Sequence, residues 1–110
     1  MLNNIIPENE LKFIEDNFEK YQAAEERLTY LESFKNALKA LLMMESHSPT
    51  VAGKEMTAYA SEEYQIWCKD YAQAKSEFSA LKLKIEVARM KCELWRSQEA
   101  SNRMIDRTIR

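Results

Sequence analysis

The chain has 110 residues and a formal net charge of −2, with 45% apolar residues, 31% charged residues, one Gly and two Pro. This length fits one small domain. Because Gly and Pro normally make up about a tenth of a chain, the sequence has too few turn-forming residues for a sandwich, a barrel or a Gly-rich phosphate-binding fold. We therefore predict an all-α protein built from a few long helices.

The charges are distributed unevenly along the chain. Residues 1–45 contain nine acids and five bases, residues 46–81 five and three, and residues 82–110 four and eight. The average charge alone gives no reason to expect a nucleic-acid or anionic-membrane ligand. The beginning of the chain is nevertheless acidic, and its end is basic.

No segment has the features of a signal peptide or a membrane span. Residues 1–7 lack a basic region followed by a long apolar stretch, and the longest apolar run, 40–44, has five residues where a span needs about 20. Cys68 and Cys92 would lie roughly 36 Å apart on one helix, too far for a disulfide. We expect a soluble cytoplasmic protein with free thiols and no membrane partner.

The first predicted helix covers residues 8–45, which contain neither Gly nor Pro. Pro7 suits the first helical position, and Glu8 and Glu10 complement the dipole of the helix. Apolar residues recur at steps of three and four over about five heptads. This stripe consists of Leu11, Ile14, Phe18, Tyr21, Ala24, Leu28, Leu31, Phe34 (or Lys35), Leu38 and Leu41.

A loop is predicted over residues 46–60. Pro49 disfavours a helical conformation in the residue before it, and Gly53 allows the chain to turn freely. A short helical turn over 54–60 is the open alternative.

The second predicted helix covers residues 61–107. Ser61 followed by Glu62 and Glu63 is typical of an N-cap with an acidic first turn. A seven-residue repeat follows, which predicts lengthwise packing against another helix. Its seam consists of Tyr64, Trp67, Tyr71, Ala74, Phe78, Leu81, Ile85, Ala88, Cys92, Trp95, Glu99 and Asn102. We predict that the two helices form an antiparallel, coiled-coil-like hairpin as a single domain over residues 1–110, with its acidic start beside its basic end.

A second apolar stripe on this helix lies about 160° from the seam, at 100° per residue. It consists of Leu83, Val87, Met90, Leu94 and Met104. One partner helix cannot cover both faces, and a two-helix hairpin buries little surface for its size. We therefore predict self-association through this stripe, with a dimeric helical bundle favoured. A different protein covering the stripe is the alternative.

Basic residues line one edge of the seam in six consecutive heptads. They are Lys75, Lys82, Arg89, Arg96, Arg103 and Arg110. These bases can pair with acids on the facing helix, or they can bind phosphates of single-stranded DNA while Trp95 stacks on a base. The candidate nucleic-acid contacts are Lys84, Lys91, Arg96, Arg103, Arg107 and Arg110.

No residue pattern typical of catalysis is found. His47 is the only histidine and has no neighbouring nucleophile or carboxylate arrangement. The two cysteines and His47 are too scattered along the chain for a zinc site. We predict a non-enzymatic protein without catalytic, cofactor-binding or metal-ligating residues. The aromatic cluster of Tyr59, Tyr64, Trp67 and Tyr71 is interpreted as either a core plug or a ligand cage.

Two segments, 59–64 (YASEEY) and 95–103 (WRSQEASNR), give residues 57–110 a resemblance to short helical proteins of unassigned function from temperate bacteriophages. Those proteins are often encoded near recombination and replication genes of the phage early region. The resemblance implies a protein of the host-cell cytoplasm that modulates a phage or host protein of DNA recombination or replication. A single-stranded-DNA-binding accessory protein is the second hypothesis.

Overall fold

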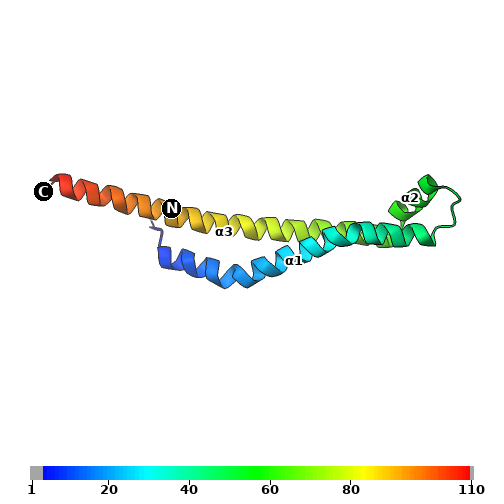
Figure 1. The fold of residues 1–110 in the computed structure, drawn as a ribbon. Coiled ribbons are helices and arrows are strands. Elements are labelled where there is room, and N and C mark those ends of the chain that lie inside the picture. The colour runs from blue at the N-terminus through cyan, green and yellow to red at the C-terminus, as the bar shows by residue number, and fades with distance from the viewer. Residues whose placement is uncertain (1–3, 110) are drawn as a thin grey trace. The chain divides into compact units, whose positions relative to one another are not determined.

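The structure is a computed structural model that describes residues 4–109. It contains three helices, α1 (Pro7–Glu45), α2 (Val51–Ala60) and α3 (Glu62–Ile109) (Figure 1). No strand occurs within the described range. The all-α prediction is therefore confirmed.

Helix α1 begins and ends at local signals in the sequence. At its start the Ile6 carbonyl accepts hydrogen bonds from the backbone N–H groups of Asn9 and Glu10. At its end the N–H of Ser46 donates to the carbonyl of Met43 at 3.2 Å. The helix thus spans 39 residues, close to the range predicted from the absence of Gly and Pro.

The loop predicted over residues 46–60 is too long, because Val51–Ala60 form α2. Thr50 caps this helix, and its hydroxyl accepts a hydrogen bond from the N–H of Gly53 at 3.0 Å. Gly53 therefore belongs to the first turn of a helix and does not supply a free turn. A Cβ at this position would meet the side chains of Ser48 and Thr50. The close approach of these two side chains to the backbone of residue 53 accounts for the glycine.

Ser61 alone separates α2 from α3. Its backbone N–H donates to the Ala58 carbonyl at 3.2 Å, and its hydroxyl donates to the same carbonyl at 2.7 Å. The Ser61 hydroxyl oxygen also accepts a hydrogen bond from the N–H of Tyr64 at 3.2 Å. The predicted N-cap of α3 is thus confirmed, and the same residue ends α2.

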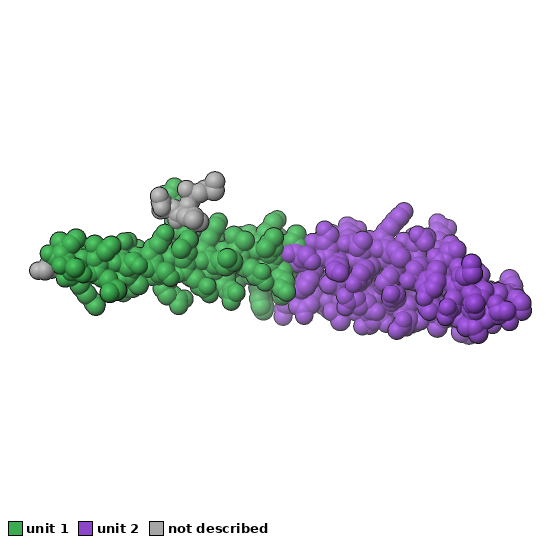
Figure 2. All heavy atoms as spheres, turned by 90° about the horizontal axis from the view of Figure 1, so that it is seen from above, with its two compact units in different colours: residues 1–21, 80–110 green, residues 22–79 purple. Residues whose placement is uncertain are grey.

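The chain divides into two compact units, coloured separately in Figure 2. Unit 1 contains Met1–Tyr21 and Ala80–Arg110, and unit 2 contains Gln22–Ser79. Each unit therefore contains part of α1 and part of α3, and α2 lies entirely in unit 2.

In unit 2, polar side chains connect α1 to α3. The indole N–H of Trp67 donates to the carbonyl of Leu31 at 2.9 Å. One turn further along α3, the hydroxyl of Tyr71 donates to the Glu32 carboxylate at 3.1 Å. In both hydrogen bonds the donor is an aromatic side chain of α3 and the acceptor is a residue of α1.

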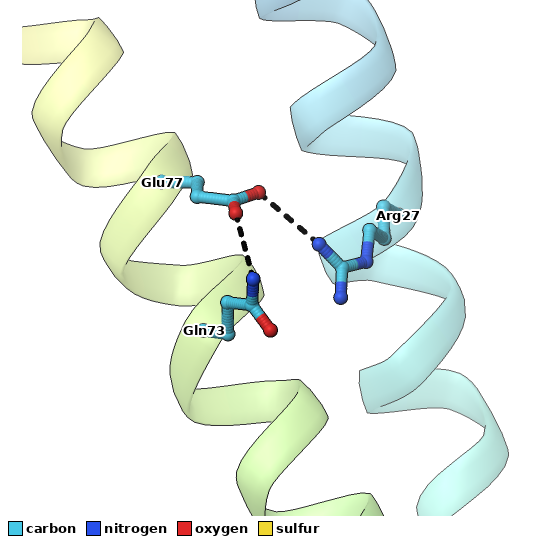
Figure 3. Close-up of polar contacts among 3 residues, drawn as sticks. All are labelled: Arg27, Gln73 and Glu77. Carbon is cyan, nitrogen blue, oxygen red and sulfur yellow. Dashed lines mark hydrogen bonds and ion pairs between the residues drawn. The ribbon is translucent and has the colours of Figure 1, made fainter.

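A third connection in unit 2 centres on the carboxylate of Glu77 (Figure 3). One of its oxygens lies 3.1 Å from the guanidinium of Arg27 on α1. The other accepts a hydrogen bond from the side-chain amide of Gln73, also at 3.1 Å. Because Gln73 precedes Glu77 by one turn of α3, it holds the carboxylate in position for Arg27.

Helix α2 contacts the end of α1 through Lys39. The Lys39 ammonium lies 3.6 Å from a carboxylate oxygen of Glu55 and 5.0 Å from the ring centre of Tyr59. Four side chains in unit 2 are buried, one of them in α2. They are Leu42, Ala58, Trp67 and Ala74.

In unit 1, the first turn of α1 contacts α3. The Lys91 ammonium lies 3.6 Å from a Glu10 carboxylate oxygen, and the thiol of Cys92 lies 4.0 Å from the Pro7 carbonyl. Ala88 is the buried apolar residue of this unit within the described range. The contact between Glu10 and Lys91 joins the acidic start of the chain to its basic end.

The predicted stripe of α1 is wrong at three positions, because Leu11, Phe18 and Leu41 are each more than half exposed. Near Phe18 the inward position is taken by Asn17, which is half-buried and donates its side-chain amide to the Phe13 carbonyl at 2.8 Å. Near Leu41 it is taken by Leu42. Counting in steps of 3.5 residues from Ile14 and Tyr21 places Asn17 and Leu42 on the inward face of α1. The position along the helix therefore decides which residues face inward, even where the residue is polar, as at Asn17.

Candidate interaction surface

The second apolar stripe of α3 lies on the surface of unit 1. The exposed fractions are 61% for Leu83, 41% for Val87, 61% for Met90 and 68% for Met104. Leu94 is partly covered. Large apolar side chains thus stand in contact with water along several turns of one helix, which is unfavourable unless another surface covers them.

A shallow groove adjoins this stripe on the side of α1. Phe13 of α1 lines it together with Leu83 and Val87 of α3. Its charged lining residues are Glu10, Lys84 and Lys91. The apolar surface therefore continues from α3 onto α1 within unit 1.

Charged residues of opposite sign border the stripe on its two sides. Glu86 and Glu93 lie on one side of α3, and Lys84 and Lys91 lie on the other, each about 80° from the centre of the stripe at 100° per residue. Lys84, Glu86 and Glu93 are exposed, whereas Lys91 is half-buried beside Glu10. The stripe thus has an acidic border and a basic border.

The basic residues near the end of α3 are exposed. Arg96, Arg103 and Arg107 form no ion pair with any residue of the range 4–109; the Arg103 guanidinium donates to the Glu99 carbonyl at 3.4 Å. Trp95, predicted as a seam residue, is 37% exposed. Lys91 is the one candidate contact that pairs with an acid of α1, and Arg110 lies outside the described residues.

The aromatic cluster forms a ladder in unit 2. The ring centres of Tyr59 and Tyr64 are 5.1 Å apart, those of Tyr64 and Trp67 5.6 Å, and those of Trp67 and Tyr71 5.2 Å. The Lys35 ammonium lies 5.7 Å from the centre of the Trp67 ring. Tyr64, Trp67 and Tyr71 stack in series, and Tyr59 meets Tyr64 edge-on. Because the rings pack against one another and against the chain's own lysine, the arrangement favours a core plug over a ligand cage.

The remaining candidate residues lie in different parts of the chain. His47 is exposed in the connection between α1 and α2, and Cys68 and Cys92 are free thiols that are partly covered. Across residues 4–109, no group of three or more His, Cys, Asp or Glu side chains is arranged to hold a metal ion. Of the described helices, none combines the length and the apolarity that a membrane crossing requires.

Three residues of this surface were missed from the sequence. Phe13 borders the stripe only because α1 contacts α3, and the sequence around Phe13 does not predict that contact. Glu86 and Glu93, by contrast, follow the same helical period as the stripe, so a search for charges beside it finds them. Comparison with protein-family models, curated proteins and solved structures finds no match to this chain.

Proposed function

We propose that the protein is a non-enzymatic helical interaction protein that self-associates, most simply as a dimer, through Leu83, Val87, Met90, Leu94 and Met104. The exposure of four of these five apolar side chains in unit 1, all but Leu94, is the observation that carries the proposal. A second copy would remove them from water, and apolar burial is the main favourable term in protein association.

An antiparallel pairing of α1 with α3 is part of this proposal. It is supported separately in each unit by contacts in which residue numbers fall along α1 as they rise along α3. In unit 2, Leu31 contacts Trp67 and Arg27 contacts Glu77. In unit 1, Glu10 contacts Lys91, and Pro7 contacts Cys92.

The shortage of buried side chains also supports self-association. Five apolar residues are buried within the described range, and three of them are alanines, Ala58, Ala74 and Ala88. A chain with so small a core gains stability when a second copy covers part of its exposed apolar surface.

The decisive experiment places two carboxylates on the stripe. We expect the double variant Leu83→Glu with Met90→Glu to sediment as a monomer at concentrations where the wild type is a dimer. Both side chains are largely exposed, so the helix can tolerate the change, whereas two unpaired carboxylates in an apolar interface are strongly unfavourable.

The matched control is Met44→Glu with Met56→Glu, two exposed positions of unit 2 that lie outside the stripe. This control should remain dimeric. A Leu83→Glu, Met90→Glu variant that stays a well-behaved dimer would refute the interface, and circular dichroism checks that the variant has kept its helices.

A phage or host protein of DNA recombination or replication is the partner we propose for the dimer. The support is the resemblance of residues 57–110 to phage early-region proteins. Sedimentation of the dimer with purified recombination and replication proteins tests this assignment. It is contradicted if none of them sediments together with the dimer.

Binding of single-stranded DNA is a second candidate function. It is supported by the exposure of Arg96, Arg103 and Arg107, which have no acidic partner among the described residues, and by the partial exposure of Trp95. Exposed guanidinium groups on one helix can contact successive phosphates, and an exposed indole can stack on a base.

Fluorescence anisotropy with a labelled single-stranded oligonucleotide distinguishes this function. Three phosphate contacts predict an affinity that falls by about 20-fold between about 50 and about 200 mM salt. Changing Arg103, Arg107 and Arg110 together to Glu should abolish the binding and leave the dimer intact. Absence of binding at low salt, or an affinity independent of salt, would exclude this function.

A further inference from the structure

We infer that two copies of α3 meet in parallel, with each residue of the stripe beside the same residue of the second copy. This inference rests on the proposed self-association and adds the orientation of the two helices. Its basis is the difference in charge between the two borders of the stripe, Glu86 and Glu93 on one side and Lys84 and Lys91 on the other.

The orientation decides which borders meet. When two identical helices pair in parallel, each border of one helix faces the opposite border of the other. A residue on the acidic border of one helix then lies beside the residue on the basic border of the second helix whose number is five higher. Glu86 of one copy thereby faces Lys91 of the second copy, and symmetry creates this pair twice.

An antiparallel pairing brings together borders of the same kind. The apolar layers would then join Leu83 to Leu94 and Val87 to Met90, a self-complementary register. In this register Lys84 faces Lys91 of the second copy. On the other side Glu86 faces Glu93, so that like charges meet on both borders. Opposite charges across an interface favour one orientation, and like charges penalise the other.

The pairing of Lys91 with Glu10 is compatible with the parallel dimer. The Lys91 ammonium lies 3.6 Å from the Glu10 carboxylate, and the Lys91 side chain is still partly exposed. Because an ammonium group has three N–H donors, Lys91 can face Glu86 of a second copy while it remains beside Glu10. Lys84, Glu86 and Glu93 are exposed and have no ion pair within the described chain.

Single cysteines test the orientation directly. Ala80 and Ser97 are exposed residues of α3 that follow the spacing of the stripe, Ala80 one step before Leu83 and Ser97 one step after Leu94. They lie about 26 Å apart along the helix. In a background with Cys68→Ser and Cys92→Ala, Ala80→Cys and Ser97→Cys are made separately and oxidised in a glutathione buffer, first alone and then mixed.

The parallel dimer predicts that each variant alone forms a disulfide-linked dimer, because identical positions lie within disulfide reach. It also predicts no disulfide between Ala80→Cys and Ser97→Cys in the mixture. The antiparallel register predicts the reverse, with a disulfide formed only in the mixture, because Ala80 then faces Ser97. That result, or a dimer that forms no disulfide in any arm, overturns the parallel orientation.

Sedimentation of the cysteine-free background separates this inference from the proposed function. A background that is dimeric but gives only the mixed disulfide leaves self-association intact and overturns the orientation alone. A wild type and a background that are both helical monomers overturn both. The wild type is therefore sedimented beside the background, so that a monomer caused by the two background substitutions is recognised.

Discussion

The hydroxyl of Tyr71 donates to the carboxylate of Glu32 at 3.1 Å, and this contact joins α3 to α1 within unit 2. The hydrogen bond, together with partial burial and the negative charge of Glu32, raises the pKa of Tyr71 above its ordinary value of 10.0. A tyrosine that keeps its proton more firmly in the folded state stabilises that state at neutral pH. The stabilisation is lost as the pH rises through the raised pKa.

The difference between the ultraviolet titrations of the wild type and Tyr71→Phe isolates this tyrosine. We expect its midpoint to lie above 10.0 and to fall in a Glu32→Gln background, where the carboxylate charge is absent. Glu25→Gln is the matched control on α1 and should leave the midpoint unchanged. A midpoint that does not respond to Glu32→Gln would contradict the assigned contact.

At the scale of the helices, the sequence predicts most accurately the features that depend on neighbouring residues. Pro7 and Ser61 mark the beginnings of α1 and α3 because an N1 proline and an N-cap serine act within one turn. The start of α2 was missed because glycine normally disfavours a helix. Here the N–H of Gly53 donates to the hydroxyl of the N-cap residue Thr50, so that Gly53 lies in the first turn of α2. Similarly, the choice of Leu42 over Leu41 depends on contacts made by the whole helix, which a local apolar pattern cannot resolve.

The candidate surface shows the same division. Helical period alone places Leu83, Val87 and Met90 on one face of α3, because all three belong to one continuous helix. The period also shows that α1 cannot cover this face and the seam together. Phe13 could not be assigned to the same surface from the sequence, since its position beside Val87 depends on a contact between distant segments.

Ala74 offers a test of how closely the helices of unit 2 approach. It is 1% exposed, and nothing larger than a methyl group occupies the position. We expect Ala74→Leu to lower the free energy of unfolding by about 1–3 kcal/mol because the larger side chain must push its neighbours apart. Urea denaturation measures the change.

Ala72→Leu is the matched control, because Ala72 is exposed on the same helix. This control should change the free energy of unfolding by less than about 0.5 kcal/mol. Equal effects of the two substitutions would mean that position 74 is not closely packed.

For the whole molecule, the dominant feature is an excess of apolar surface over buried core. Alanines and Trp67 fill most of the buried positions of the described chain, while Leu83, Met90 and Met104 remain in water. A core of this size gives a small margin of stability. Association would therefore contribute to folding as well as to function, and the stability of the protein should increase with its concentration.

Analytical ultracentrifugation across the micromolar range tests the central claim most directly. We predict a dimer that dissociates on dilution and that disappears in the Leu83→Glu, Met90→Glu variant but persists in the Met44→Glu, Met56→Glu control. A wild-type protein that stays a stable, fully helical monomer throughout this range would contradict the claim that the stripe of α3 is an interface.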